Sequence, residues 1–167
     1  MYGLGLGEVH TYEFSVPIPL DEGFVLENGG EELRLYGVWP NLVRTSSLPA
    51  EGLEGRLVYG GRALEDIEGV EVDGKVVVLE YRSGMYWVDV FHLGARAVVF
   101  IGAEGGHRKE AEQKFLDVPA DLPRFYAAAD VEARLMEWAR QGAVVRLRGN
   151  MPWRKGVGKI LVGVIPG

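Results

Sequence analysis

The chain changes its pattern of apolar and polar positions near residue 75. Before that point the apolar runs are short, as in antiparallel strands joined by loops. Turn signals interrupt these runs at residues 21–23, 28–30 and 60–61. Residues 10–18 alternate as a strand does, and Pro17 and Pro19 confine the end of that strand to a sheet edge. Further short strands are expected at residues 33–40 and 55–61.

From residue 74 onward the pattern predicts a strand, a helix and a second strand. Residues 74–81 and 96–102 are apolar and β-branched, which is typical of strands buried on both faces. Between them, Met85, Val88 and Leu93 recur at helical spacing, and Gly94 is placed to end the helix. Two strands joined by a helix of this length are expected to be parallel.

The last third of the chain contains the strongest helix signal. Over residues 129–143, Asp130 is placed to cap the helix, and Gly142 to end it. One face of this helix is lined by Val131, Leu135 and Trp138. A shorter polar helix is expected at 108–116, and strands at 122–127, 144–150 and 159–167. Because the final apolar run meets the end of the chain, we expect a segment of a longer protein.

Composition narrows the class of protein without naming a function. The 167 residues, 47% hydrophobic and 25% charged, predict one compact globular domain, or one domain plus an arm. A net charge of −6 argues against a nucleic-acid partner or an anionic membrane. No apolar run is long enough to span a bilayer. The absence of cysteine excludes disulfides, thiolate zinc sites and cysteine nucleophiles.

Two glycine-rich stretches resemble nucleotide-binding motifs only superficially. Residues 69–75 match a phosphate-loop pattern, but Val76 stands where Ser or Thr is required, and the segment precedes a strand instead of a helix. Residues 3–7 contain three glycines, yet no strand comes before them, as a dinucleotide fingerprint needs. We interpret both stretches as turns.

Catalytic and metal-binding patterns are equally sparse. The three histidines, His10, His92 and His107, are far apart in the sequence, and none lies in an H-x-D or H-E-x-x-H pair. Ser83 follows a strand and precedes a helix, as a nucleophile elbow does, but no neighbouring residue supplies a base. His107 lies after a predicted parallel strand, where ligands often bind in such sheets.

Tryptophan is the remaining residue type with a functional signal. Trp138 and Trp87 lie on predicted helices and are expected to pack in the core. Trp39 and Trp153 lie in predicted loops, where packing explains a large aromatic side chain less easily. An interface role is the alternative for these two, because tryptophan often anchors contacts.

Several motifs in order resemble the protease-associated (PA) domain. They are Tyr59–Gly61 (Y-G-G), the acidic turn Asp66–Asp73, Gly74–Val78 (G-K-V-V-V) and Gly94–Ile101 (G-A-R-A-V-V-F-I). The later L-P-R-F-Y-A and G-A-V-V-R-L segments are similar to the closing part of that family. The resemblance covers roughly residues 50–148. It implies an α/β fold with a mixed sheet, as a sandwich or open barrel flanked by two or three helices, of the swivelling β/β/α type.

The flanking segments resemble those of a PA domain inserted in a two-zinc aminopeptidase. In that family an N-V-x-x-x-I-P-G segment opens the catalytic domain, and Ile160–Gly167 is similar to it, with Lys159-Ile160 in place of Asn-Val. None of the family's zinc ligands has a counterpart here. The resemblance therefore implies a non-catalytic accessory domain that shapes substrate access, binds no cofactor itself, and contacts its own peptidase domain and peptide or protein substrates. Zinc is expected in the parent's catalytic domain, and an exported or membrane-associated parent is implied.

We expect three parts along the chain and one contact surface. Residues 1–48 form a β-rich flanking segment packed on the PA-like domain, residues 49–150 form that domain, and residues 151–167 form a closing strand that leads towards an absent catalytic domain. The expected peptide or partner contact lies at the carboxyl end of the parallel strands. Its candidate residues are Arg82, Ser83, Gly84, Trp87, Glu104 and His107.

Two other functions remain open on the sequence. One is a free-standing α/β domain that binds a small molecule or peptide. The other is a hydrolase that uses an unrecognised site around Ser83 or His107.

Overall fold

A computed structural model describes residues 8–115 and 118–164, and the chain forms two compact units. One unit combines residues up to Leu20 with those from Trp153 onward, and the other is Asp21–Pro152. These limits differ from the divisions at residues 48 and 150 drawn from the sequence, because two strands of the expected flanking segment belong to the larger unit. The functional meaning of residues 1–48 and 151–167 stays a prediction.

The smaller unit is a two-stranded antiparallel ribbon. Strand β1 (Val9–Pro19) pairs along its whole length with β9 (Trp153–Gly163). The strand predicted at residues 10–18 is confirmed. Trp153, expected in a loop, is the first residue of β9. The glycines at 3–7, the residue at 116 and residues 165–167 of the terminal motif lie outside the described residues.

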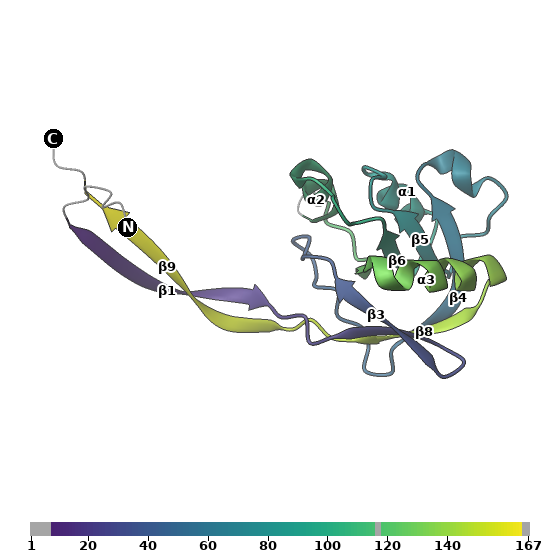
Figure 1. Ribbon diagram of the computed structural model, residues 1–167, viewed down its shortest axis with the longest axis horizontal. Helices are drawn as coiled ribbons and strands as arrows, with labels where there is room; N and C mark the ends of the chain where they lie inside the picture. The colour runs from purple at the N-terminus through teal and green to yellow at the C-terminus, as the bar shows by residue number, and fades with distance from the viewer. Residues whose placement is uncertain (1–7, 116–117, 165–167) are drawn as a thin grey trace. The chain divides into compact units, whose positions relative to one another are not determined.

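The larger unit is a seven-stranded mixed barrel (Figure 1). Its strands are β2 (Phe24–Asn28), β3 (Glu31–Gly37), β4 (Leu53–Gly61), β5 (Val76–Glu80), β6 (Ala97–Ile101), β7 (Arg124–Ala127) and β8 (Val144–Gly149). Around the barrel they follow the order β2-β3-β7-β6-β5-β4-β8, and β4, β5, β6 and β7 run parallel. The α/β fold with a mixed sheet is confirmed, in the form of a barrel whose sheet closes.

Three α-helices and one short 3-10 helix connect these strands. They are η1 (Leu64–Ile67), α1 (Tyr86–His92), α2 (Arg108–Phe115) and α3 (Ala129–Gln141). None of the described helices is long and apolar enough to cross a lipid bilayer. The predicted stretch 69–75 is a loop that precedes β5, as the turn interpretation requires.

Two details of the helices correct the sequence interpretation. The buried face of α1 is formed by Tyr86, Trp87 and Val90, whereas the predicted face included Met85, which is exposed. Asp130 does not cap α3: the capping position is Ala128, which makes no side-chain cap bond, and Asp130 lies in the first turn. An acidic side chain there still stabilises the helix through its dipole.

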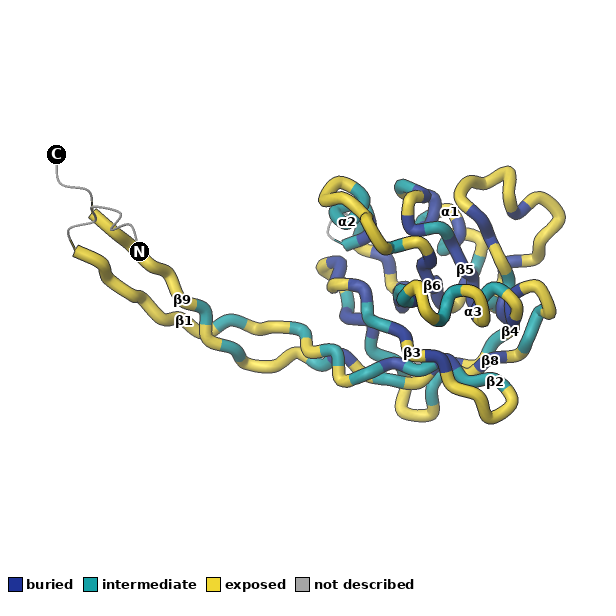
Figure 2. Tube along the Cα trace, in the orientation of Figure 1, coloured by how far each residue is buried: buried dark blue, intermediate teal, exposed yellow. Residues whose placement is uncertain are grey.

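The apolar runs build two separate cores, one on each face of the curved sheet. Along β5, Val76 and Val78 face the barrel interior, where α3 packs, whereas Val77 and Leu79 face α1. This arrangement explains why β6 is apolar at every position, and β5 at every position except its last, Glu80, instead of alternating. Figure 2 shows the consequence, with buried residues concentrated in the barrel strands and exposed residues along β1 and β9.

Candidate functional site

The carboxyl ends of β4, β5, β6 and β7 gather at one rim of the barrel because these strands are parallel. Two surface hollows lie at this rim, and a third lies beside β7, next to the end of β3. The charged hollow, about 340 Å³, is lined by Tyr59, Arg62, Glu80, Arg82 and Gly102. The acidic hollow, about 400 Å³, is lined by Ala103, Glu104, Tyr126, Ala127, Ala128, Ala129 and Asp130. The apolar hollow, about 470 Å³, is lined by Gly37, Val38, Trp39, Phe115 and Tyr126.

In the charged hollow, a tyrosine and a glutamate from neighbouring strands form a hydrogen bond. The Tyr59 hydroxyl donates to Glu80 Oε1 at 3.0 Å. Partial burial, followed by this bond to a carboxylate, raises the pKa of Tyr59 to about 12. Tyr59 is therefore a neutral donor whose proton is already engaged at neutral pH.

Arg82 joins the end of β5 to the loop that follows β6. Its Nη2 donates to the carbonyl oxygen of Gly105 at 2.9 Å, and its own carbonyl oxygen accepts from Arg62 Nε at 3.0 Å. The structure thus brings together three of the residues singled out by sequence, namely Arg82, Glu104 and His107, which lie on one exposed loop system. Through its bond to Gly105, Arg82 holds the loop after β6 close to the end of β5.

Ser83, Gly84 and Trp87 are more buried than the other three residues singled out by sequence. Trp87 is fully buried, with Nε1 donating to the carbonyl oxygen of Gln113 at 3.0 Å, and Ser83 is also buried. The guanidinium carbon of Arg124 lies over the Trp87 ring, 4.7 Å from its centroid. Trp87 therefore packs in the core, as expected for a tryptophan on this helix, and Ser83 exposes little surface; the role of these residues in a peptide contact stays a prediction.

A buried lysine connects helix α2 to the turn that precedes α1. Lys114 of α2 donates through Nζ to the carbonyl oxygen of Gly84 and forms an ion pair with Glu110 Oε2 at 3.2 Å. Burial lowers the pKa of Lys114, and the Glu110 carboxylate opposes that shift. Because its ammonium bonds the Gly84 turn, Lys114 fixes the start of α1 against α2.

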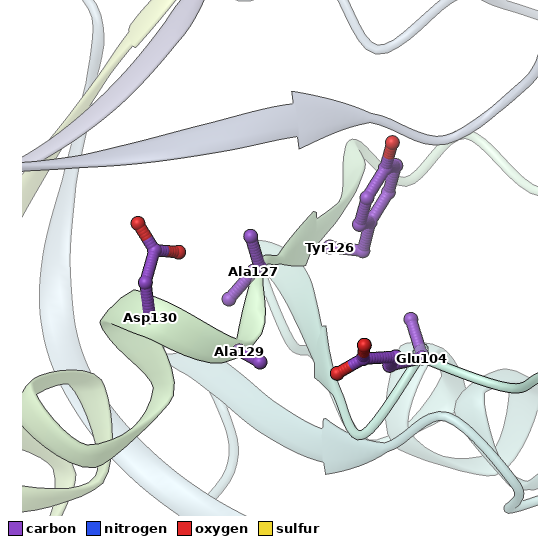
Figure 3. A pocket seen from close by; sticks show the side chains of 7 residues that line it. Glu104, Tyr126, Ala127, Ala129 and Asp130 are labelled. Carbon is purple, nitrogen blue, oxygen red and sulfur yellow. The ribbon is translucent and has the colours of Figure 1, made fainter.

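Apart from Glu104, the acidic hollow is lined by residues that the sequence did not mark as functional (Figure 3). Glu104 follows β6, Tyr126 belongs to β7, and Asp130 belongs to the first turn of α3. A run of alanines between Tyr126 and Asp130 leaves the space open, because alanine has no side chain beyond Cβ. Next to the hollow, a hydrogen bond joins the end of β6 to α3: Glu132 Oε1 accepts the backbone N–H of Gly102 at 2.6 Å.

Tyr126 forms part of two hollows at once. Its ring stacks on that of Tyr36 from β3, with centroids 5.1 Å apart. The acidic hollow and the apolar hollow share Tyr126 as a lining residue. Trp39 of the apolar hollow is 51% exposed, so the loop placement expected for this tryptophan is confirmed.

In the described part of the chain, the side chains do not assemble a metal site or an activated serine nucleophile. Within residues 8–115 and 118–164, no three His, Asp or Glu side chains lie close enough to hold a metal ion, so these residues do not fit a zinc centre. The Ser83 hydroxyl has no hydrogen-bond partner among the described residues, so no base is positioned to activate it.

Comparison with known proteins identifies relatives in fold only. No family model matches the sequence, and no curated protein is significantly similar to it. Among solved structures, the fold is similar to a zinc aminopeptidase from Bacillus subtilis, at 16% identity and a TM-score of 0.60, over 93% of this chain and 36% of that chain. It is also similar to a peptidase M28 precursor from Shewanella amazonensis, at 15% identity and a TM-score of 0.58, over 95% and 40%.

A third match is an aminopeptidase from Aneurinibacillus sp. strain AM-1, at 17% identity and a TM-score of 0.51, over 93% of this chain and 36% of that chain. The chain therefore spans well under half the length of the proteins that it matches. It has the fold of a segment of these aminopeptidases, and the likeness is one of fold, not of sequence.

Proposed function

We propose that this chain is a PA-like accessory domain of a zinc-dependent aminopeptidase, in which it shapes substrate access without performing catalysis. The observation that carries the proposal is the similarity of more than nine tenths of this chain to only 36–40% of each aminopeptidase chain. The ordered PA-like motifs from Tyr59 to Ile101 support the same assignment. The zinc ions would belong to the remaining part of the parent, which we expect to be exported.

The ribbon supports a contact with the parent's peptidase domain. Apolar side chains are exposed along both strands, including Tyr12, Phe14, Val157, Ile160 and Leu161. An isolated two-stranded ribbon is marginally stable in water, and its exposed apolar side chains favour burial against another surface. We infer that the peptidase domain provides this surface.

The rim of the barrel supports a contact with substrate. Arg82, Glu104 and His107 are exposed there, next to hollows that can receive side chains. Ligands of open parallel sheets commonly bind at the carboxyl ends of the strands. In the parent enzyme, Arg82→Ala and His107→Ala are expected to change the selectivity among peptide substrates more than the turnover of the preferred one.

The decisive test is the coding sequence around this chain. A reading frame that continues into an H-x-D pair and a later Glu-Glu pair supports the accessory-domain proposal. A frame without these residues overturns it and favours a free-standing binding domain. The second test is an aminopeptidase assay on the isolated chain with added Zn²⁺, in which no turnover is expected, and turnover abolished by Ser83→Ala would establish a hydrolase instead.

A further inference from the structure

The acidic hollow and the apolar hollow are both lined by Tyr126, and together they are called the groove. Both hollows are open to solvent, and they use different sets of residues apart from Tyr126. Stacking against Tyr36 holds the ring in place. A ligand that lies across Tyr126 can therefore place one group in each hollow.

The apolar hollow is suited to a large apolar side chain. Trp39 exposes half of its surface, and the half-buried rings of Phe115 and Tyr126 complete the lining. Exposed tryptophan and tyrosine are the residue types most often found at the energetic centre of protein contacts, because they bury much apolar area at a small cost in side-chain entropy. An aliphatic or aromatic group placed here would remove these surfaces from water.

The acidic hollow is suited to a cationic group. Glu104 and Asp130 both carry exposed carboxylates at its edge, and Figure 3 shows the two side chains on either side of the alanine run, with Tyr126 beside Glu104. An ammonium or guanidinium group in this hollow would be attracted by both carboxylates. The same two carboxylates would repel an anion, even though the N-terminus of α3 lies close by.

The framework of the groove is fixed by contacts outside it. The loop that carries Glu104 is held by the bond from Arg82 to Gly105, and by the bond from the Gly102 N–H to Glu132. At Gly106 the backbone lies so close to the Tyr81 ring that a Cβ atom would approach it to 2.7 Å. Glu104 is therefore positioned before a ligand arrives, which reduces the entropy lost on binding.

From this arrangement we propose that the groove binds an extended peptide segment with a Lys or Arg side chain and a large apolar side chain two residues apart. In an extended chain, side chains at positions i and i+2 point to the same side and are separated by roughly 7 Å. A segment that lies across Tyr126 can therefore direct one side chain to each of the two hollows that this residue lines. The net charge of −6 also favours a basic segment over an acidic one. This inference rests on the proposed function and names the substrate class that the accessory domain would select.

The test uses capped five-residue peptides and the ¹⁵N-labelled chain. The probe contains Lys-Ala-Phe between two alanines, and the reversed order Phe-Ala-Lys is measured beside it because the direction of the peptide is open. In an NMR titration, we expect at least one of the two to shift the indole signal of Trp39 and the amides of residues 103–104 and 128–130. The indole of Trp153, which is also exposed but lies on the ribbon, provides the internal control.

Substituted peptides and matched variants separate the two contacts. Replacing the peptide's Lys by Glu should weaken binding at least tenfold, and replacing its Phe by Ala should do the same. Trp39→Ala should weaken binding about tenfold, whereas Trp153→Ala should have no effect. Glu104→Gln should weaken it several-fold and reduce its salt dependence, whereas the exposed Glu51→Gln should do neither. The double variant Glu104→Gln/Asp130→Asn should lose preference for the basic peptide.

The result that overturns the proposal is equal binding of the Lys and Glu peptides, or no shift of the Trp39 signal with millimolar peptide of either order. Spectra of each variant without peptide verify that it is folded. Because these measurements use the chain without a peptidase, their failure leaves the accessory-domain proposal in place, which the flanking reading frame decides. Conversely, a reading frame without zinc ligands would leave peptide binding measurable as a property of a free-standing domain.

Discussion

The barrel and the ribbon are both built from apolar strands, but they use them in opposite ways. In the barrel, the inward side chains of β5 and β6 are buried completely, and α1 covers the outward ones. In the ribbon, Phe14 is 46% exposed and Leu161 is 71% exposed. The barrel and its helices therefore bury the apolar side chains of their own strands, whereas the ribbon leaves its apolar side chains exposed. Similar strand patterns can belong to a self-sufficient fold or to a segment that requires another surface.

The ribbon is nevertheless built for a defined packing of its own. The ring of Phe14 lies over Gly158 on the opposite strand, so close that a Cβ atom there would approach it to 2.5 Å. Ile18 lies over Gly156 in the same way. Large side chains that cover cross-strand glycines set the register of a ribbon. The register of β1 and β9 is therefore specified within the pair, even though the faces remain exposed.

The largest expected effect is the loss of a buried aromatic ring from the barrel. Phe125 is fully buried and its ring centroid lies 4.9 Å from that of Phe24. Phe125→Ala should lower the free energy of unfolding by about 3–5 kcal/mol, because it removes apolar contacts and leaves a cavity. Urea unfolding monitored by circular dichroism measures this loss. A loss below about 1 kcal/mol would show that the barrel does not depend on its inner core.

The matching substitution in the ribbon should hardly change the free energy of global unfolding. Phe14→Ala removes a half-exposed ring, so the free energy of unfolding of the barrel should change by about 0.5 kcal/mol or less. Hydrogen exchange should instead become faster at the amides of β1 and β9, since the ring no longer covers Gly158. If Phe14→Ala destabilises the barrel as much as Phe125→Ala does, the two units unfold together and the comparison fails.

A third test concerns the ionisation of Tyr59 at the barrel rim. The raised pKa of Tyr59, about 12, means that folding favours its neutral form. The resulting stabilisation is complete below pH 10 and is lost as the pH rises from about 10 towards 12. Absorbance at 295 nm should show a late phase of tyrosine ionisation near pH 12, and Tyr59→Phe should reduce its amplitude. Tyr86, whose pKa burial also raises to about 12, should contribute to the same phase.

The smallest effects are expected from surface ion pairs, one in each unit. In the barrel, Arg134 Nη2 and Glu31 Oε2 are 2.6 Å apart, and Arg134 also pairs with Glu137. The hydrogen bonds from Arg134 lower the pKa of Glu31, so its contribution is present at neutral pH and is lost as the pH falls through that lowered value. Glu31→Gln should lower the melting temperature slightly at pH 7 and leave it unchanged near pH 2.

In the ribbon, Glu13 and Lys159 form a single contact of 2.9 Å between opposite residues. Glu13→Gln should leave the melting temperature of the barrel unchanged, because a single exposed pair contributes little and is screened by salt. Differential scanning calorimetry at low and high salt compares the two variants. A larger effect from Glu13→Gln than from Glu31→Gln would contradict the independence of the two units.

Part of the candidate site could be predicted from sequence, because strand ends and turns are local features. The apolar runs at 74–81 and 96–102 predicted two parallel strands, and the residues after them, Arg82 and Glu104, do lie on the same exposed loop system. The helix face of α1 could not be predicted as reliably. Both of its sides carry apolar residues: Trp87 is buried as expected, but Met85, which the spacing placed on the same face as Val88, is exposed.

The strand β2 was not anticipated, and it shows where local pattern is insufficient. Its five residues lie between turn signals and have a weak strand pattern, yet they pair with β3 on one side and β8 on the other and so close the barrel. Closure depends on the register of strands more than one hundred residues apart, such as Phe24 opposite Gly149. No short stretch of sequence contains that information.

The sequence by itself determined the alternation of strands and helices, the two fully apolar strands, and the end of α3 at Gly142, where the positive φ of 60° favours glycine. These depend on backbone preference and on the spacing of apolar residues, which act over a few positions. The sequence also anticipated which tryptophans are buried, whereas only the tertiary structure placed Trp39, Glu104, Tyr126 and Asp130 around two hollows that share Tyr126. The physical reason is that hollows are properties of surfaces that meet, and those surfaces come from residues distant in the chain.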